Sequence, residues 1–142
     1  MAVTVERAHR WALHPLHAVV LAGTVPLFLG ALLSDLAYWC SYEIQWSNFA
    51  SWLIVGGLVP ALIVVLWALV QLVRADDRRG RSLSYFLVVL LMWVLGFVDA
   101  LVHAQDAWAA MPGGLVLSTV VAVLACAATW LGFSGARTGA AP

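Results

Sequence analysis

The chain has 142 residues, of which 64% are hydrophobic and only 10% are charged. This composition, with a mean hydropathy of +0.98, lies outside the range of soluble globular domains and indicates an integral membrane protein. Acidic and basic residues balance, and the chain contains no lysine. The sequence therefore gives no basis for nucleic acid as a partner.

Four apolar stretches are long enough to cross a bilayer as helices, which takes about 20 residues. They are expected at residues 15–38, 49–73, 83–103 and 113–133. We therefore predict an all-α fold in which four transmembrane helices form one domain over residues 15–133 and run up-down-up-down. Short cytoplasmic tails are expected at residues 1–14 and 134–142.

The first stretch could be mistaken for a signal peptide, because Arg7 and Arg10 precede it. It is longer than the apolar segment of a signal peptide and contains Pro26, so we interpret it as a retained helix. Pro15 is suited to a first helical turn, where a missing N–H costs nothing. His14 is then the predicted N-cap residue.

The basic residues predict the orientation of the helices. They lie before the first span, between spans two and three and after span four: Arg7, Arg10, Arg74, Arg78, Arg79, Arg81 and Arg137. An excess of arginine in short loops marks the cytoplasmic side. We therefore expect a multi-pass protein of the bacterial inner membrane with both termini inside.

The other two loops and the adjoining span ends carry acids only. Asp35, Glu43, Asp99 and Asp106 belong to this side, where His103 is the single candidate cation. The spacing of Asp99, His103 and Asp106 would place all three on one face if the third helix continued beyond His103. Two interpretations stay open: water-exposed interfacial residues, or a site built from Asp35, Asp99 and His103 that could hold a metal ion.

The remaining histidines of interest lie at the opposite ends of the spans. His14 and His17 are three residues apart, so their rings could approach and bind a haem or quinone cofactor. The alternative is that one caps the helix while the other sits at headgroup level. His103 is a third candidate cofactor ligand, but about 30 Å should separate it from His17, too far for one haem to join them.

Catalysis by a nucleophile is a poor fit, since no Ser, Cys or Thr is expected at the depth of a histidine. We assign no catalytic residue, and the chain is at most a redox subunit. Cys40 and Cys126 should differ in depth, which argues against a disulfide between them.

Several short motifs resemble bacterial membrane proteins grouped as family of unknown function 2231. They are His14-Pro15-Leu16-His17, Ser34-Asp35-Leu36, Ser51-Trp52-Leu53 and Thr129-Trp130-Leu131-Gly132. The resemblance implies a four-helix membrane protein with a role in electron transfer beside a periplasmic dehydrogenase. The family's histidine at the start of span three and arginine at its end are replaced here by Ser82-Leu83-Ser84-Tyr85 and Val102-His103-Ala104. Only His14, His17 and Asp35 match.

Three functions compete. The first is an electron-transfer anchor that binds haem b or a quinone for a periplasmic dehydrogenase. The second is a structural subunit without a cofactor, which joins a protein partner or further copies of itself through glycine-rich helix faces. The third is a transporter of protons, metal ions or small solutes, for which four spans are few and no inverted repeat is evident.

Overall fold

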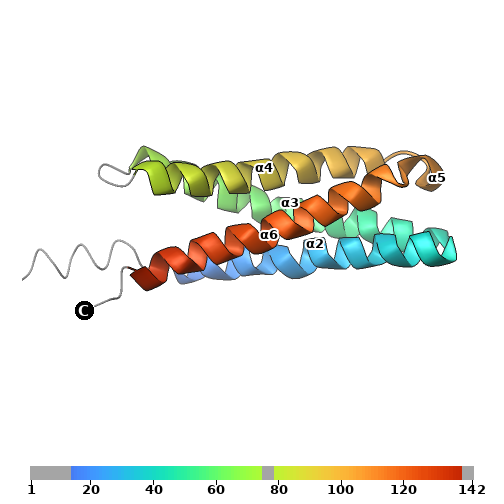
Figure 1. Cartoon of the computed structure of the whole chain (residues 1–142), viewed down its shortest axis with the longest axis horizontal. Coiled ribbons are helices and arrows are strands. Elements are labelled where there is room, and N and C mark those ends of the chain that lie inside the picture. Colours follow the sequence, from blue (N-terminus) through green and yellow to red (C-terminus); the bar gives the residue numbers. More distant parts are fainter. Residues whose placement is uncertain (1–13, 75–78, 139–142) are drawn as a thin grey trace, which may run out of the picture.

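The computed structural model describes residues 14–74 and 79–138. Its elements are α2 (Pro15–Ser41), α3 (Ile44–Val73), α4 (Arg79–His103), α5 (Ala107–Ala110) and α6 (Gly113–Thr138), as Figure 1 shows. Within these ranges every element is a helix, and four of the helices are long and apolar enough to cross a membrane. The prediction of an all-α membrane protein with four spans is confirmed.

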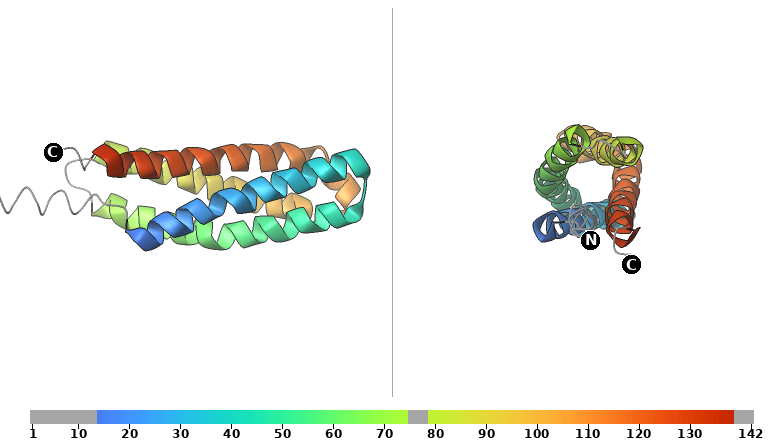
Figure 2. Two further views of the ribbon diagram at one scale, coloured as in Figure 1. Left: turned by 90° about the horizontal axis from the view of Figure 1, so that it is seen from below. Right: turned by 90° about the vertical axis from the view of Figure 1, so that its left-hand side faces the viewer.

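The four long helices form a square bundle, which is seen from one end in Figure 2. Each packs against two neighbours: α2 against α3 and α6, and α4 against α3 and α6. Successive long helices run in opposite directions (Figure 1). This arrangement places residues far apart in sequence, such as those late in α2 and early in α6, at the same level.

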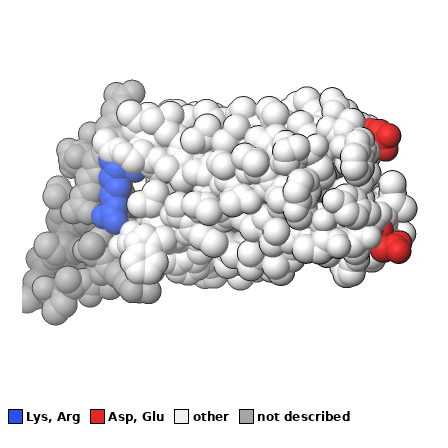
Figure 3. Space-filling view, turned by 45° about the vertical axis from the view of Figure 1, so that its right-hand side comes forward, with Lys and Arg blue, Asp and Glu red and all other residues white. Residues whose placement is uncertain are grey.

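The two ends of the bundle differ in charge. One end, where α3 finishes and α4 begins, carries Arg74 and Arg81, and we call it the arginine end. At the other, the acidic end, Glu43 and Asp106 are exposed. Figure 3 shows basic and acidic side chains gathered at opposite ends, with an uncharged surface between them.

The helix boundaries follow the apolar pattern closely at some ends and extend beyond it at others. Helix α2 begins at Pro15 as expected, with His14 as its N-cap: the Leu16 N–H donates to His14 Nδ1 at 3.3 Å. Helix α3 begins earlier than expected, at Ile44, because polar residues before the apolar stretch continue the helix. The short α5 was not predicted.

The middle of the bundle is packed around Phe28, which is 1% exposed. A methyl group at Gly57 would lie 2.9 Å from the Phe28 ring, and one at Gly96 would lie 3.5 Å from it. The glycines therefore let α3 and α4 close around this aromatic side chain, as small residues commonly do in membrane helices. Gly23 has no such neighbour within 4 Å.

Candidate functional site

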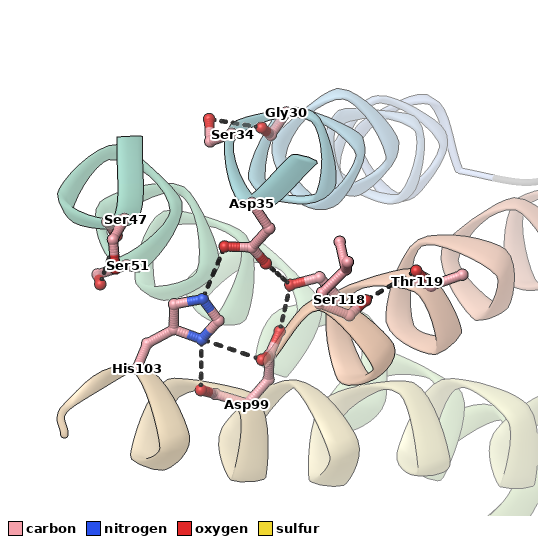
Figure 4. A network of polar contacts seen from close by, with 10 residues as sticks. Gly30, Ser34, Asp35, Ser47, Ser51, Asp99, His103, Ser118 and Thr119 are labelled. Carbon is pink, nitrogen blue, oxygen red and sulfur yellow. Dashed lines mark hydrogen bonds and ion pairs between the residues drawn. The ribbon is translucent and has the colours of Figure 1, made fainter. Parts of the chain in front are cut away.

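Four polar side chains meet inside the bundle near the acidic end, and we call them the polar cluster. They are Asp35 from α2, Asp99 and His103 from α4, and Ser118 from α6 (Figure 4). Their exposed fractions are 0%, 1%, 7% and 1%. Asp35 lies about 9 Å along α2 from the end of that helix, so the cluster is close to the acidic end but closed off from water.

Helical spacing and a close approach of α6 build this cluster. Asp99 and His103 are one turn apart and share a face of α4. A methyl group at Gly114 would lie only 2.7 Å from His103 Cε1. Because glycine stands there, α6 can pack directly on the imidazole, which brings Ser118, one turn further along α6, to the same level.

His103 uses one ring nitrogen to contact α2 and the other to contact its own helix, α4. Its Nε2 is 2.9 Å from Asp35 Oδ1. Its Nδ1 is 3.0 Å from the backbone oxygen of Asp99 and 3.1 Å from Asp99 Oδ1. Only the backbone contact has hydrogen-bond geometry, and Asp99 Oδ1 has no hydrogen-bond partner. We therefore describe a hydrogen bond to the carbonyl beside a close electrostatic contact with the carboxyl group.

Ser118 joins the two carboxyl groups from the opposite side. Its Oγ is hydrogen-bonded to Asp35 Oδ2 and lies 3.0 Å from Asp99 Oδ2. A serine hydroxyl carries a single proton and two lone pairs, so it can donate to one of these oxygens only. The other contact needs a proton from a carboxyl group.

The structure places two of these acids away from water. Interfacial carboxylates would face water, whereas Asp35 and Asp99 are buried and in contact with His103. Asp106 does not share their face, because α4 ends at His103, as expected, and Asp106 is an exposed residue before α5.

The sequence reasoning missed Ser118. The premise that no hydroxyl lies at the depth of a histidine is wrong, since Ser118 shares two carboxylate partners with His103. Its hydroxyl is nevertheless bonded to the carboxyl groups rather than to the imidazole, so the pair does not have the arrangement of a nucleophile and its base. A row of small buried residues on α6, with Gly114 one turn before Ser118, could have pointed to this face.

The predicted metal ligands Asp35, Asp99 and His103 are thus brought together, but by direct contacts. Among the described residues, no group of three or more His, Cys, Asp or Glu side chains is arranged to hold a metal ion. The separations of 2.9 and 3.1 Å are those of hydrogen-bonded or ion-paired atoms. We assign no metal ligand here, and the metal site stays a prediction of the sequence.

A second polar group lies at the arginine end. His17 is 2% exposed, and its Nε2 is 3.0 Å from the hydroxyl oxygen of Tyr85. Its Nδ1 is buried without a hydrogen-bond partner. The ring of Trp67 packs against both His14 and His17, with centroid distances of 5.4 and 5.3 Å. The two predicted ligands therefore share an aromatic neighbour from α3.

The two polar groups lie at opposite ends of the bundle. Tyr85, which contacts His17, is near the start of α4, and His103 is the last residue of that helix. At 1.5 Å per residue, α4 rises about 27 Å between them. This agrees with the expectation that His17 and His103 cannot bind one haem.

Comparison with known proteins gives one match. The family model described as "Predicted membrane protein (DUF2231)" matches residues 13–138. No curated protein and no solved structure matches the chain. The match covers all four spans and both polar groups.

Proposed function

Because the chain belongs to the DUF2231 family of predicted membrane proteins, a description that names no activity, we propose a function from its own geometry. The protein acts as a small membrane subunit of a redox complex and binds a quinone headgroup at the arginine end. His17, Tyr85 and Trp67 hold the headgroup.

The observation that carries this proposal is the buried Nδ1 of His17, which lacks a hydrogen-bond partner. A buried polar atom of this kind costs about 1–3 kcal/mol unless something satisfies it. Tyr85 occupies the other ring nitrogen and fixes the ring orientation. A ligand with a carbonyl oxygen would complete the hydrogen bonding of the imidazole.

The surroundings of His17 support a flat ligand. Trp67 is half-buried and packs against His17, while His14 at the edge of the bundle is exposed. Aromatic side chains with one polar neighbour are typical of sites for planar ligands. A headgroup that enters from the membrane beside Trp67 could accept a hydrogen bond from His17 and stack on the indole.

Haem b is less well supported than a quinone. The Nε2 atom of His17, which is the nitrogen further from the backbone, already contacts Tyr85, and His14 uses Nδ1 to cap α2. Iron ligation through His17 Nε2 would break the Tyr85 contact. A quinone needs only a hydrogen bond from the unpartnered nitrogen.

A bound quinone accepts two electrons and two protons from a dehydrogenase. The arginine excess supports a cytoplasmic location for this end. Electrons from a periplasmic enzyme would then have to cross about 27 Å of apolar bundle. The geometry therefore favours an electron donor that docks at the arginine end, on the cytoplasmic face.

Binding of a short-chain benzoquinone to the purified full chain, measured by equilibrium dialysis, tests the proposal. We expect one quinone per chain and about tenfold weaker binding for His17→Phe, which keeps the packing against Trp67 but removes the donor. Tyr42→Phe, at the exposed acidic end, is the matched control and should bind normally. Absence of binding, or equal binding by His17→Phe, refutes the proposal; a Soret band in the purified protein would favour haem instead.

One observation favours the structural alternative. Gly56 is exposed on α3, and Gly23 on α2 has no side chain packed against it within 4 Å. Open small-residue surfaces suit association with another membrane helix or a second copy of this chain. On this alternative, His17→Phe leaves the activity of the partner complex unchanged.

A further inference from the structure

The hydrogen bonds of the polar cluster at the acidic end allow the protons that it holds to be counted. Four contacts have hydrogen-bond geometry: His103 Nε2 to Asp35, His103 Nδ1 to the Asp99 carbonyl, and Ser118 Oγ to each carboxyl group. Each contact needs one proton between its two heavy atoms. The carbonyl oxygen carries none, so that proton is on Nδ1. Ser118 supplies one more, which leaves two for the remaining contacts.

These two protons determine the charge of the cluster. With two ionised carboxylates, a neutral imidazole and the serine hydroxyl, the residues hold two protons and a charge of −2. Placing one proton in each of the four hydrogen bonds adds two protons to this state and brings its charge to zero. We call this the filled state. The result is the same whether the proton between His103 and Asp35 is on nitrogen or oxygen.

Burial favours this filled state. A net charge inside a membrane bundle is costly unless a partner compensates it. Removing the fourth proton would leave a charge of −1 and would place Ser118 Oγ against a carboxylate oxygen with no hydrogen between them. Asp99 Oδ1 is buried and has no hydrogen-bond donor. The two carboxyl groups therefore have more oxygen atoms than donors to satisfy them.

We infer that Asp35, Asp99, His103 and Ser118 form a proton-binding site that is neutral when filled and exchanges one proton with water at the acidic end. This function goes beyond the proposed quinone site and does not depend on it. The path from the cluster to the surface is short, because Ala104, Gln105 and Asp106 directly after His103 are exposed.

The neighbouring groups fit a site that binds protons. On α2 the closest titratable residue beyond Asp35 is the buried Tyr38. On α3 the Ser51 hydroxyl donates to the Ser47 carbonyl of the same helix (Figure 4). The ionisable groups beyond them, Glu43 and Asp106, are exposed acids. Within the described residues no arginine lies at this end, so His103 is the basic side chain beside the two buried carboxyl groups.

Infrared spectroscopy of the full chain in lipid nanodiscs tests the inference. At neutral pH the wild type should show the C=O band of a protonated carboxyl group, and the band should lose one carboxyl equivalent as one proton per chain is released at higher pH. Asp99→Asn should lose one carboxyl equivalent from this band, because the amide N–H can donate to Ser118 in place of the acid proton. The variant should also release one proton fewer.

Asp106→Asn is the matched control, since Asp106 is an exposed acid of the same end outside the cluster. It should keep both the band and the proton release of the wild type. The inference is overturned if the wild type has no protonated carboxyl group at neutral pH. It is also overturned if Asp99→Asn, with unchanged helical circular dichroism, matches the wild type in band and proton release.

Discussion

Replacing Gly114 by alanine should destabilise the bundle by forcing the His103 ring away from its partners. The new Cβ would lie 2.7 Å from Cε1 and 3.3 Å from Nε2 of that ring. Carbon atoms prefer separations of about 3.5–4.0 Å, so the ring or α6 must move by about 1 Å. Such a shift would extend the 2.9 Å contact between His103 and Asp35 beyond hydrogen-bond range.

The expected loss has two parts. Overpacking costs about 1–3 kcal/mol, and a lost hydrogen bond to a charged group about 1.5–3 kcal/mol. Alanine regains up to about 1 kcal/mol through its higher helix propensity. We therefore expect Gly114→Ala to lower the free energy of unfolding by about 1.5–5 kcal/mol.

The assay is unfolding in mixed micelles, with the mole fraction of SDS as the denaturant variable and circular dichroism as the signal. Gly113→Ala is the matched control, because a Cβ at Gly113 meets nothing within 4 Å. It should be neutral or slightly stabilising. If the two variants are equally stable, the close packing of α6 on His103 is not what holds this cluster together.

Two further predictions concern the cluster and the orientation. Ser118→Ala should lower the free energy of unfolding by about 1–3 kcal/mol in the same assay, because it removes the hydroxyl that is hydrogen-bonded to two buried carboxyl groups. Ser84→Ala, at an exposed serine, should change the free energy of unfolding little, and equal effects of the two variants would contradict the reasoning. Cys40 is exposed at the acidic end, so in the Cys126→Ser variant a membrane-impermeant maleimide should label it in right-side-out vesicles but not in inside-out ones. The reverse labelling would mean that the arginine end faces the periplasm.

Much of the fold could be predicted because lipid imposes a simple rule on the sequence. Apolar stretches of sufficient length become helices, and Pro15 and the end of α4 at His103 were located correctly. The early start of α3 comes from polar residues that continue the helix, and the short α5 buries Ala107 and Ala110. Neither feature leaves a periodic pattern in so short a segment.

The polar cluster could be predicted only in part. Asp99 and His103 are one helical turn apart, and acids inside a span stand out by their cost. Ser118 does not stand out, because a serine can satisfy its hydroxyl on its own helix and is common in membrane spans. Its role depends on which helix packs beside α2 and α4, and this is a property of the tertiary structure.

The same limit applied at the arginine end. The spacing of His14 and His17 predicted that the two rings could approach each other, but it did not predict that both contact Trp67, which comes from α3. Tyr85 contributes a hydroxyl from α4. Contacts between helices this far apart in sequence need the register of the whole bundle, which hydropathy alone does not supply.

The tight packing of Phe28 against Gly57 and Gly96 fills the middle of the bundle, between the polar cluster and the arginine end. Most buried residues around this level are apolar, among them Ala61, Val64, Val89, Met92, Val121 and Ala125. The buried Thr24 donates its hydroxyl to the Leu21 carbonyl of its own helix. On the proton-binding function that we infer, a proton held near Asp35 would exchange with the aqueous phase at the acidic end. Its occupancy would then follow the acidity of that compartment.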